Sequence, residues 1–101
     1  MRTYTIMPEN GFHVLGKSDR SEAATMVLEA GETTGGADNR HSGSDQWLYV
    51  LQGSGEATVG DASVGLTPGM LLLIEAGETH QVSASPDGPL QTLNFYAPPA
   101  Y

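Results

Sequence analysis

The chain has 101 residues, of which 39% are hydrophobic, and this is enough for one compact core and too little for two. Its formal net charge is -8, and all of its Lys and Arg residues lie within the first 40 positions. Nucleic acids and anionic membranes are bound by clustered Lys and Arg, so both classes of partner are excluded. Cysteine is absent, which excludes disulfides, thiolate metal sites and thiol nucleophiles.

The N-terminus carries no apolar run of signal-peptide length, and the chain has no run of 18 consecutive apolar residues. No internal repeat or low-complexity linker divides it. We therefore expect a single cytoplasmic domain over residues 1–101.

Glycine and proline separate short apolar runs at intervals of roughly ten residues, a spacing typical of β-sandwiches and barrels. The pattern predicts an all-β fold. Gly60-Asp61 reads as a tight hairpin turn, because Gly60 can adopt positive φ without steric cost. The expected strands are Arg2–Ile6, Phe12–Leu15, Ala24–Ala30, Gln46–Leu51, Gly55–Val59, Ala62–Leu66, Met70–Ile74, His80–Ala84 and Leu90–Tyr96.

One segment also fits a helix. Asp19–Glu22 resembles a capping box, Ala23–Ala30 includes good helix formers, and Gly31 suits a helix end. The β-branched Thr25 and Val27 favour a strand, which we predict here.

Gly11–Ser18 matches the phosphate-binding pattern G-x-x-x-x-G-K-[ST]. A working phosphate loop needs a parallel α/β sheet, which 101 residues of this pattern cannot complete. Bulky Phe12 and Leu15 also stand where the loop needs small residues. We interpret the match as accidental.

Polar side chains with ligand chemistry lie between Asn39 and His80. In an extended segment Asn39 and His41 project to the same face. Gln46 opens an apolar strand and shares a face with its alternate apolar residues, and His80 opens a later strand. These side chains can converge only inside a closed barrel.

The spacing of these residues resembles that of the cupin superfamily. Its first motif is Gly, five residues, His-x-His, three or four residues, Glu, six residues, Gly. Here the corresponding residues are Asn39-x-His41, Gln46 and Gly53, and the second motif is echoed by Gly69, Glu75-x-Gly77 and His80. The resemblance covers residues 24–96 and implies a double-stranded β-helix, the jelly-roll barrel.

The departures from the family pattern concern its ligands. Cupins hold a metal with three histidines and one glutamate, so the resemblance implies His41 and His80 as ligands here. Asn39 stands at the first histidine and Gln46 at the glutamate. Glu75 replaces the second-motif proline and Ala84 its asparagine.

Neutral amide ligands weaken the hold on a divalent cation and leave it more net positive charge, so anionic ligands are drawn to its open positions. The candidate ions are Zn²⁺, Ni²⁺, Fe²⁺, Mn²⁺ and Co²⁺. Glu75 and Glu78 are the candidate carboxylates beside this set. The alternative is a metal-free barrel whose His41, His80 and Gln46 are satisfied by protein hydrogen bonds.

Two classes of function follow. One is a metal-dependent enzyme of dioxygenase or isomerase type that acts on a small oxygenated acid. The other is a ligand-binding or sensing module without catalysis. We predict metal-dependent binding of a small anionic organic ligand, assign no catalytic residue, and leave turnover open.

Features outside this set have structural interpretations. We expect His13 at the surface, and Trp47 and Tyr49 on the face opposite Gln46, between sheets or at a subunit contact. The tail Phe95–Tyr101 should form an extended strap at the barrel mouth. Exposed apolar edges predict a homodimer.

Overall fold

A computed structural model describes residues 1–34 and 43–101. Within these residues the chain forms nine strands and no helix, so no described helix could cross a membrane. The strands are β1 Gly11–Lys17, β2 Glu22–Leu28, β3 Thr33–Thr34, β4 Asp45–Gln52, β5 Gly55–Val59, β6 Ala62–Leu66, β7 Leu71–Ile74, β8 His80–Ala84 and β9 Leu90–Ala97.

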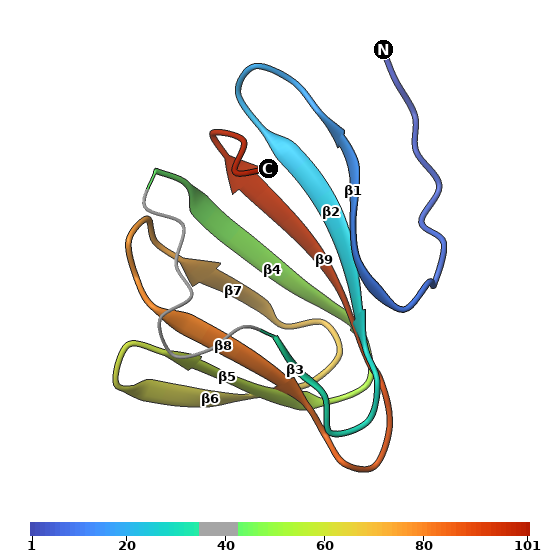
Figure 1. The fold of residues 1–101 in the computed structure, drawn as a ribbon, viewed down its shortest axis with the longest axis vertical. Coiled ribbons are helices and arrows are strands. Elements are labelled where there is room, and N and C mark those ends of the chain that lie inside the picture. Colours follow the sequence, from blue (N-terminus) through green and yellow to red (C-terminus); the bar gives the residue numbers. More distant parts are fainter. Residues whose placement is uncertain (35–42) are drawn as a thin grey trace.

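The strands form two antiparallel sheets. One has the order β1-β2-β9-β4-β7, and the other has the order β3-β8-β5-β6. In Figure 1 the two sheets face each other, and β9 lies between β2 and β4, far from both in sequence. The predicted all-β fold is confirmed, and the arrangement is that of a double-stranded β-helix.

Three predicted strands have the bounds observed for β5, β6 and β8. The segment Glu22–Leu28 is a strand, so the helix alternative is wrong. Its alternate residues Ala24, Met26 and Leu28 are buried on the inner face. Alternate residues of the segment are buried against the core, and this packing outweighs the helix propensity of its individual residues.

The predicted strand Arg2–Ile6 is wrong, since this segment belongs to no sheet. It packs by side chains instead: a Cβ placed on Gly16 would overlap the Tyr4 ring. The Arg2 guanidinium donates a hydrogen bond to the Lys17 carbonyl oxygen at 3.3 Å. The alternation in the sequence is real, but almost every side chain of the segment is exposed, so no buried face drives pairing.

Gly11–Ser18 does not form a phosphate loop. Its residues form the edge strand β1, which pairs with β2 through Phe12 opposite Met26. Backbone amides that pair with a neighbouring strand cannot cradle a phosphate. The segment is therefore a strand of an antiparallel sheet and lacks the strand–loop–helix context that the motif requires.

Two glycines fix turns beside the barrel. Gly60 has φ of 57° and joins β5 to β6 with Val59 opposite Ala62, which confirms the predicted hairpin. Gly53 has φ of 82°, and a Cβ there would overlap the Pro89 carbonyl oxygen. Only glycine permits this close approach of the β4–β5 turn to the β8–β9 loop.

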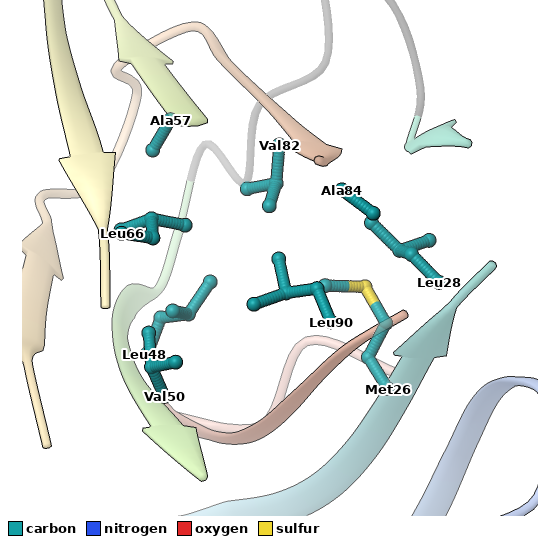
Figure 2. Close-up of a cluster of buried hydrophobic side chains, with 9 residues drawn as sticks. All are labelled: Met26, Leu28, Leu48, Val50, Ala57, Leu66, Val82, Ala84 and Leu90. Carbon is teal, nitrogen blue, oxygen red and sulfur yellow. The ribbon is translucent and has the colours of Figure 1, made fainter. Parts of the chain in front are cut away.

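The hydrophobic core is a cluster contributed by both sheets (Figure 2). Met70 and Leu72 pack against it. Its buried members are Met26, Leu28, Leu48, Val50, Ala57, Leu66, Val82, Ala84 and Leu90. Ala84, which occupies the family's asparagine position, is thus a core residue.

Candidate functional site

The inner face of the five-stranded sheet changes from apolar to polar along its strands. Strand register places these residues in successive cross-strand rows: Leu28 and Leu90; Met26, Thr92 and Val50; Ala24, Asn94 and Leu48; Glu22, Tyr96, Gln46 and Ile74. Apolar residues dominate the first three rows, since Asn94 shares its row with Ala24, Leu48 and Leu72, and polar residues dominate only the last row. A polar end of the barrel therefore lies beyond the apolar core.

Gln46 stands at this polar end. It shares the inner face of β4 with Leu48 and Val50, as the period of two predicted, and only 5% of its surface is exposed. Its Oε1 atom is buried and has no hydrogen-bond partner in the described structure. A buried carbonyl oxygen without a partner costs about 1–3 kcal/mol, so this atom is available to a ligand or ion.

His80 is the first residue of β8, on the facing sheet, and is 5% exposed. Its Nδ1 lies 3.2 Å from the Glu78 carbonyl oxygen. Because a carbonyl can only accept, Nδ1 is the donor in this contact, and Nε2 is the ring nitrogen left to face another group. A backbone carbonyl on one ring nitrogen is the usual support of a histidine that ligates through the other.

Gln46 and His80 lie at the same end of the barrel. Each stands two rows beyond a core residue of its own strand, Val50 on β4 and Ala84 on β8. Val50 and Ala84 both belong to the core cluster, so β4 and β8 each run from the core toward the same end of the barrel. Figure 1 shows β4 and β8 beginning on the same side of the molecule.

Asn94 and Thr92 are site residues that the sequence analysis missed. Both side chains are fully buried on the inner face of β9, and Thr92 Oγ1 donates to Asn94 Oδ1 at 3.5 Å. Asn94 Nδ2 is buried without a partner in the described structure. The signal was present in the alternation Leu90-x-Thr92-x-Asn94, which places polar groups on the face that should be apolar.

The predicted ligands Asn39 and His41 lie outside the described residues. Within residues 1–34 and 43–101 no three His, Asp or Glu side chains are grouped to hold a metal. His13 is at the surface as expected, with Nε2 at 2.9 Å from the Asn10 carbonyl oxygen. Glu78 accepts a hydrogen bond from the Glu75 amide at 2.8 Å, so its carboxylate is occupied in its own turn.

A buried carboxylate that the sequence analysis did not single out holds the C-terminal tail. Glu22 Oε1 accepts hydrogen bonds from the backbone amides of Ala100 and Tyr101 at 3.0 and 2.8 Å. Ser44 Oγ donates to the Pro98 carbonyl oxygen at 2.7 Å. These contacts hold residues 98–101 at the polar end of the barrel, whereas Phe95–Ala97 of the predicted strap belong to β9.

Tyr96 connects the tail to the site. Its ring lies 5.2 Å from that of Tyr101 and 6.4 Å from that of Phe12. Burial raises the pKa of Tyr96 far above its usual value, and the neighbouring Tyr101 and Glu22 add to the effect. The phenol therefore stays neutral, on the residue that pairs with Gln46 across the strands.

The family model for the cupin domain matches residues 24–96 of this chain. The chain belongs to the cupin family. None of the curated proteins matches this cupin in sequence.

Solved structures agree with this assignment. BH2720 of Bacillus halodurans is 26% identical with a TM-score of 0.85, over 91% of this cupin and 73% of that chain. TT1209 of Thermus thermophilus is 28% identical with a TM-score of 0.78, over 96% and 90% of the two chains. An uncharacterized double-stranded β-helix protein of Klebsiella pneumoniae is 20% identical with a TM-score of 0.82, over 97% and 90%.

Proposed function

We propose that the polar end of this cupin binds a small anionic, oxygenated organic molecule with the help of a divalent transition metal, which is Zn²⁺, Ni²⁺, Fe²⁺, Mn²⁺ or Co²⁺. The proposed metal ligands are His41, Gln46, His80 and Asn39. The observation that carries the proposal is a pair of buried polar atoms of opposite character, Gln46 Oε1 and Asn94 Nδ2, which have no partner in the described structure.

The donor chemistry fits a metal ion. Gln46 Oε1 offers a lone pair that no donor of the described residues uses, and His80 contributes a buried imidazole at the same end of the barrel. Amide oxygen and neutral imidazole are accepted by all of the candidate ions. Bound there, the ion would supply Lewis acidity toward a carboxylate or carbonyl oxygen.

Asn94 supports an anionic occupant. Its Nδ2 can only donate, and burial without an acceptor among the described residues makes it a preformed partner for a ligand oxygen. Thr92 accounts for the other amide atom by donating to Asn94 Oδ1, which fixes the orientation of the group. The site thus combines one acceptor for a cation with one donor for an anion.

Binding is favoured over turnover by the state of the carboxylates. Glu78 accepts a hydrogen bond from a backbone amide in its own turn, and Glu75 is exposed in the β7–β8 turn. Glu22 is held to the tail through Oε1, and its Oε2 is buried without a partner among the described residues. A general base must reach the substrate proton from a position inside the site. We therefore propose a binding or sensing role.

Elemental analysis of protein purified without added metal tests the proposal. We expect near-stoichiometric metal in the wild type and in the surface control His13→Ala, and loss of metal in His80→Ala. Gln46→Glu, which restores the family's carboxylate, should raise metal retention during dialysis against a chelator. Equal metal in His80→Ala and His13→Ala would contradict the metal site.

Thermal shift with small mono- and dicarboxylates then tests the ligand. We expect stabilisation that depends on both metal and Asn94, and product analysis of the same mixtures reports any turnover. Stabilisation that persists after the metal is removed would favour the metal-free module instead.

A further inference from the structure

The outer face of strands β9, β4 and β7 carries a continuous apolar surface. Its side chains form two cross-strand rows, here called the apolar ladder: Phe95, Trp47 and Leu73; Leu93, Tyr49 and Leu71. Five of the six are between 36% and 57% exposed, and Leu93 is half-buried. A sheet that faced water here would carry polar residues at these positions.

The chain covers the neighbouring part of the same face by itself. Thr25 lies on the outer face of β2 and is only 2% exposed. The N-terminal segment lies over this strand, with Tyr4 lining a hollow with Ala23 and Phe95, and Pro8 lining one with Val27. Among residues 1–34 and 43–101 this cover reaches only the Phe95 end of the apolar ladder, and most of the ladder is exposed.

The charges around the apolar ladder are segregated across the sheet. Asp45 and Glu75 lie next to each other beyond Gln46 and Ile74, at the β7 side. Arg2 lines the hollow that includes Lys17 and Phe95, at the β1–β2 side. Lys17 lies at the end of the same cross-strand row as Gln46 and Ile74, so the acidic and basic groups flank one end of the strands.

We propose that the apolar ladder is the contact surface between two copies of this chain, related by a two-fold axis that runs along the strands. Rotation about such an axis exchanges the β7 side and the β1–β2 side while it keeps the strand end. Glu75 and Asp45 of one copy then face Arg2 of the other, twice. Each chain has a net charge of -8, but the centre of this contact is uncharged and the charges at its edges are opposite in sign.

The area supports this occupant. Trp47, Tyr49, Leu71, Leu73 and Phe95 together expose on the order of 400 Å² of apolar surface, the scale of a functional patch on a monomer. A stable interface of standard size buries about 800 Å² on each partner, of which the centre is apolar and the rim polar. The apolar ladder supplies the centre, and the charged flanks supply the rim.

Sedimentation equilibrium measures the outcome directly. Wild type is expected at twice the chain mass of 10.6 kDa, and Leu73→Lys at the mass of one chain. Ser63→Lys is the control, because Ser63 is exposed on the outer face of β6 in the other sheet, away from the apolar ladder. The wild type should be dimeric at a chain concentration of about 100 µM, roughly the largest dissociation constant expected of a specific complex. A monomeric wild type at that concentration, or a Leu73→Lys protein that remains dimeric, overturns the proposal.

Trp47, the single tryptophan, reports the same contact. Its emission should shift to longer wavelength on dilution of the wild type and stay at the long-wavelength position in Leu73→Lys. Circular dichroism on each variant separates dissociation from unfolding. Emission that is independent of concentration in a dimeric wild type overturns the assignment to this face.

A charge swap tests the two-fold arrangement. Glu75→Lys should weaken association about tenfold, and Arg2→Glu should do the same. The double variant should recover most of the loss, because the swapped charges face each other again. Failure of the double variant to recover overturns the proposed axis, whereas recovery confirms it.

Discussion

The two ends of this barrel are built on opposite principles. At one end Leu28, Leu90 and Ala84 close a cluster without polar atoms. At the other end Gln46, Asn94 and Glu22 are buried just as deeply, and each has a polar atom without a partner among the described residues. The same strands supply both ends, so the difference lies only in the residues placed on successive inward positions.

This difference separates stability from function. The apolar end stabilises the fold through burial, at about 25 cal/mol per Å² of apolar surface removed from water. The polar end lacks this stabilisation. Its buried polar groups cost free energy until a ligand or ion makes hydrogen bonds with them or coordinates them. Substitutions at the two ends should therefore affect stability and binding in opposite proportions.

The largest effect is expected at the apolar end. Leu90→Ala removes a fully buried side chain from the core cluster and should lower the free energy of unfolding by about 3–4 kcal/mol. Urea unfolding checks this, with Val64→Ala as an exposed control that should change it by less than about 0.5 kcal/mol. A smaller loss in Leu90→Ala than in Asn94→Leu would break the comparison.

The tail contact gives the next effect. Glu22→Gln keeps the shape but removes the charge that strengthens both hydrogen bonds from Ala100 and Tyr101. We expect a loss of about 1–2 kcal/mol in the free energy of unfolding. Amide hydrogen exchange at Ala100 and Tyr101 should accelerate, while exchange in β5 stays slow. Unchanged exchange in the tail would show that Glu22 does not hold it.

Alkaline pH sharpens the comparison at Tyr96. Burial raises the pKa of Tyr96 above the ordinary value of 10.0, so the folded chain keeps a proton that the unfolded chain loses. The contribution of Tyr96 to the free energy of unfolding is therefore complete below pH 10. Above pH 10 it is lost at about 1.4 kcal/mol per pH unit, the slope for one group. Urea unfolding between pH 9 and about 11 should show this slope in the wild type and a shallower one in Tyr96→Phe.

The smallest change in stability is expected at Asn94. Asn94→Leu removes the unpartnered Nδ2 group but also takes the acceptor from Thr92 Oγ1, so the two effects offset and the free energy of unfolding should stay within about 1 kcal/mol of the wild type. The carboxylate-induced thermal shift should disappear in the same variant. A clear loss of stability together with unchanged ligand binding would show that the polar end is structural.

Local pattern predicted much of the molecule. The period of two placed Gln46 on the same face as Leu48 and Val50, and turn chemistry placed Gly60 correctly. The local pattern wrongly predicted a strand at Arg2–Ile6, where the residues alternate but the segment pairs with no strand. It also missed the two-residue strand β3, because a segment of that length carries no period.

The candidate site was predictable only in part. His80 and Gln46 follow from spacing and from the resemblance to cupins. Asn94 and Thr92 did not, although the alternation places them on the same face as Leu90. Glu22 lies outside the predicted strand Ala24–Ala30, so the sequence gives no sign of its burial. The assignment of ligands to Asn39 and His41 remains a prediction.

By itself the sequence determined the all-β class and the cupin spacing around Gln46 and His80, and it predicted a single domain over residues 1–101. These follow from composition, periodicity and turn residues, which act over a few positions. Only the tertiary structure decided that the barrel has an apolar and a polar end, that Glu22 holds a tail more than 70 residues away, and that most of the apolar ladder is exposed. Those properties depend on strands that pair across long sequence separations, and no local pattern encodes which faces such pairing will cover.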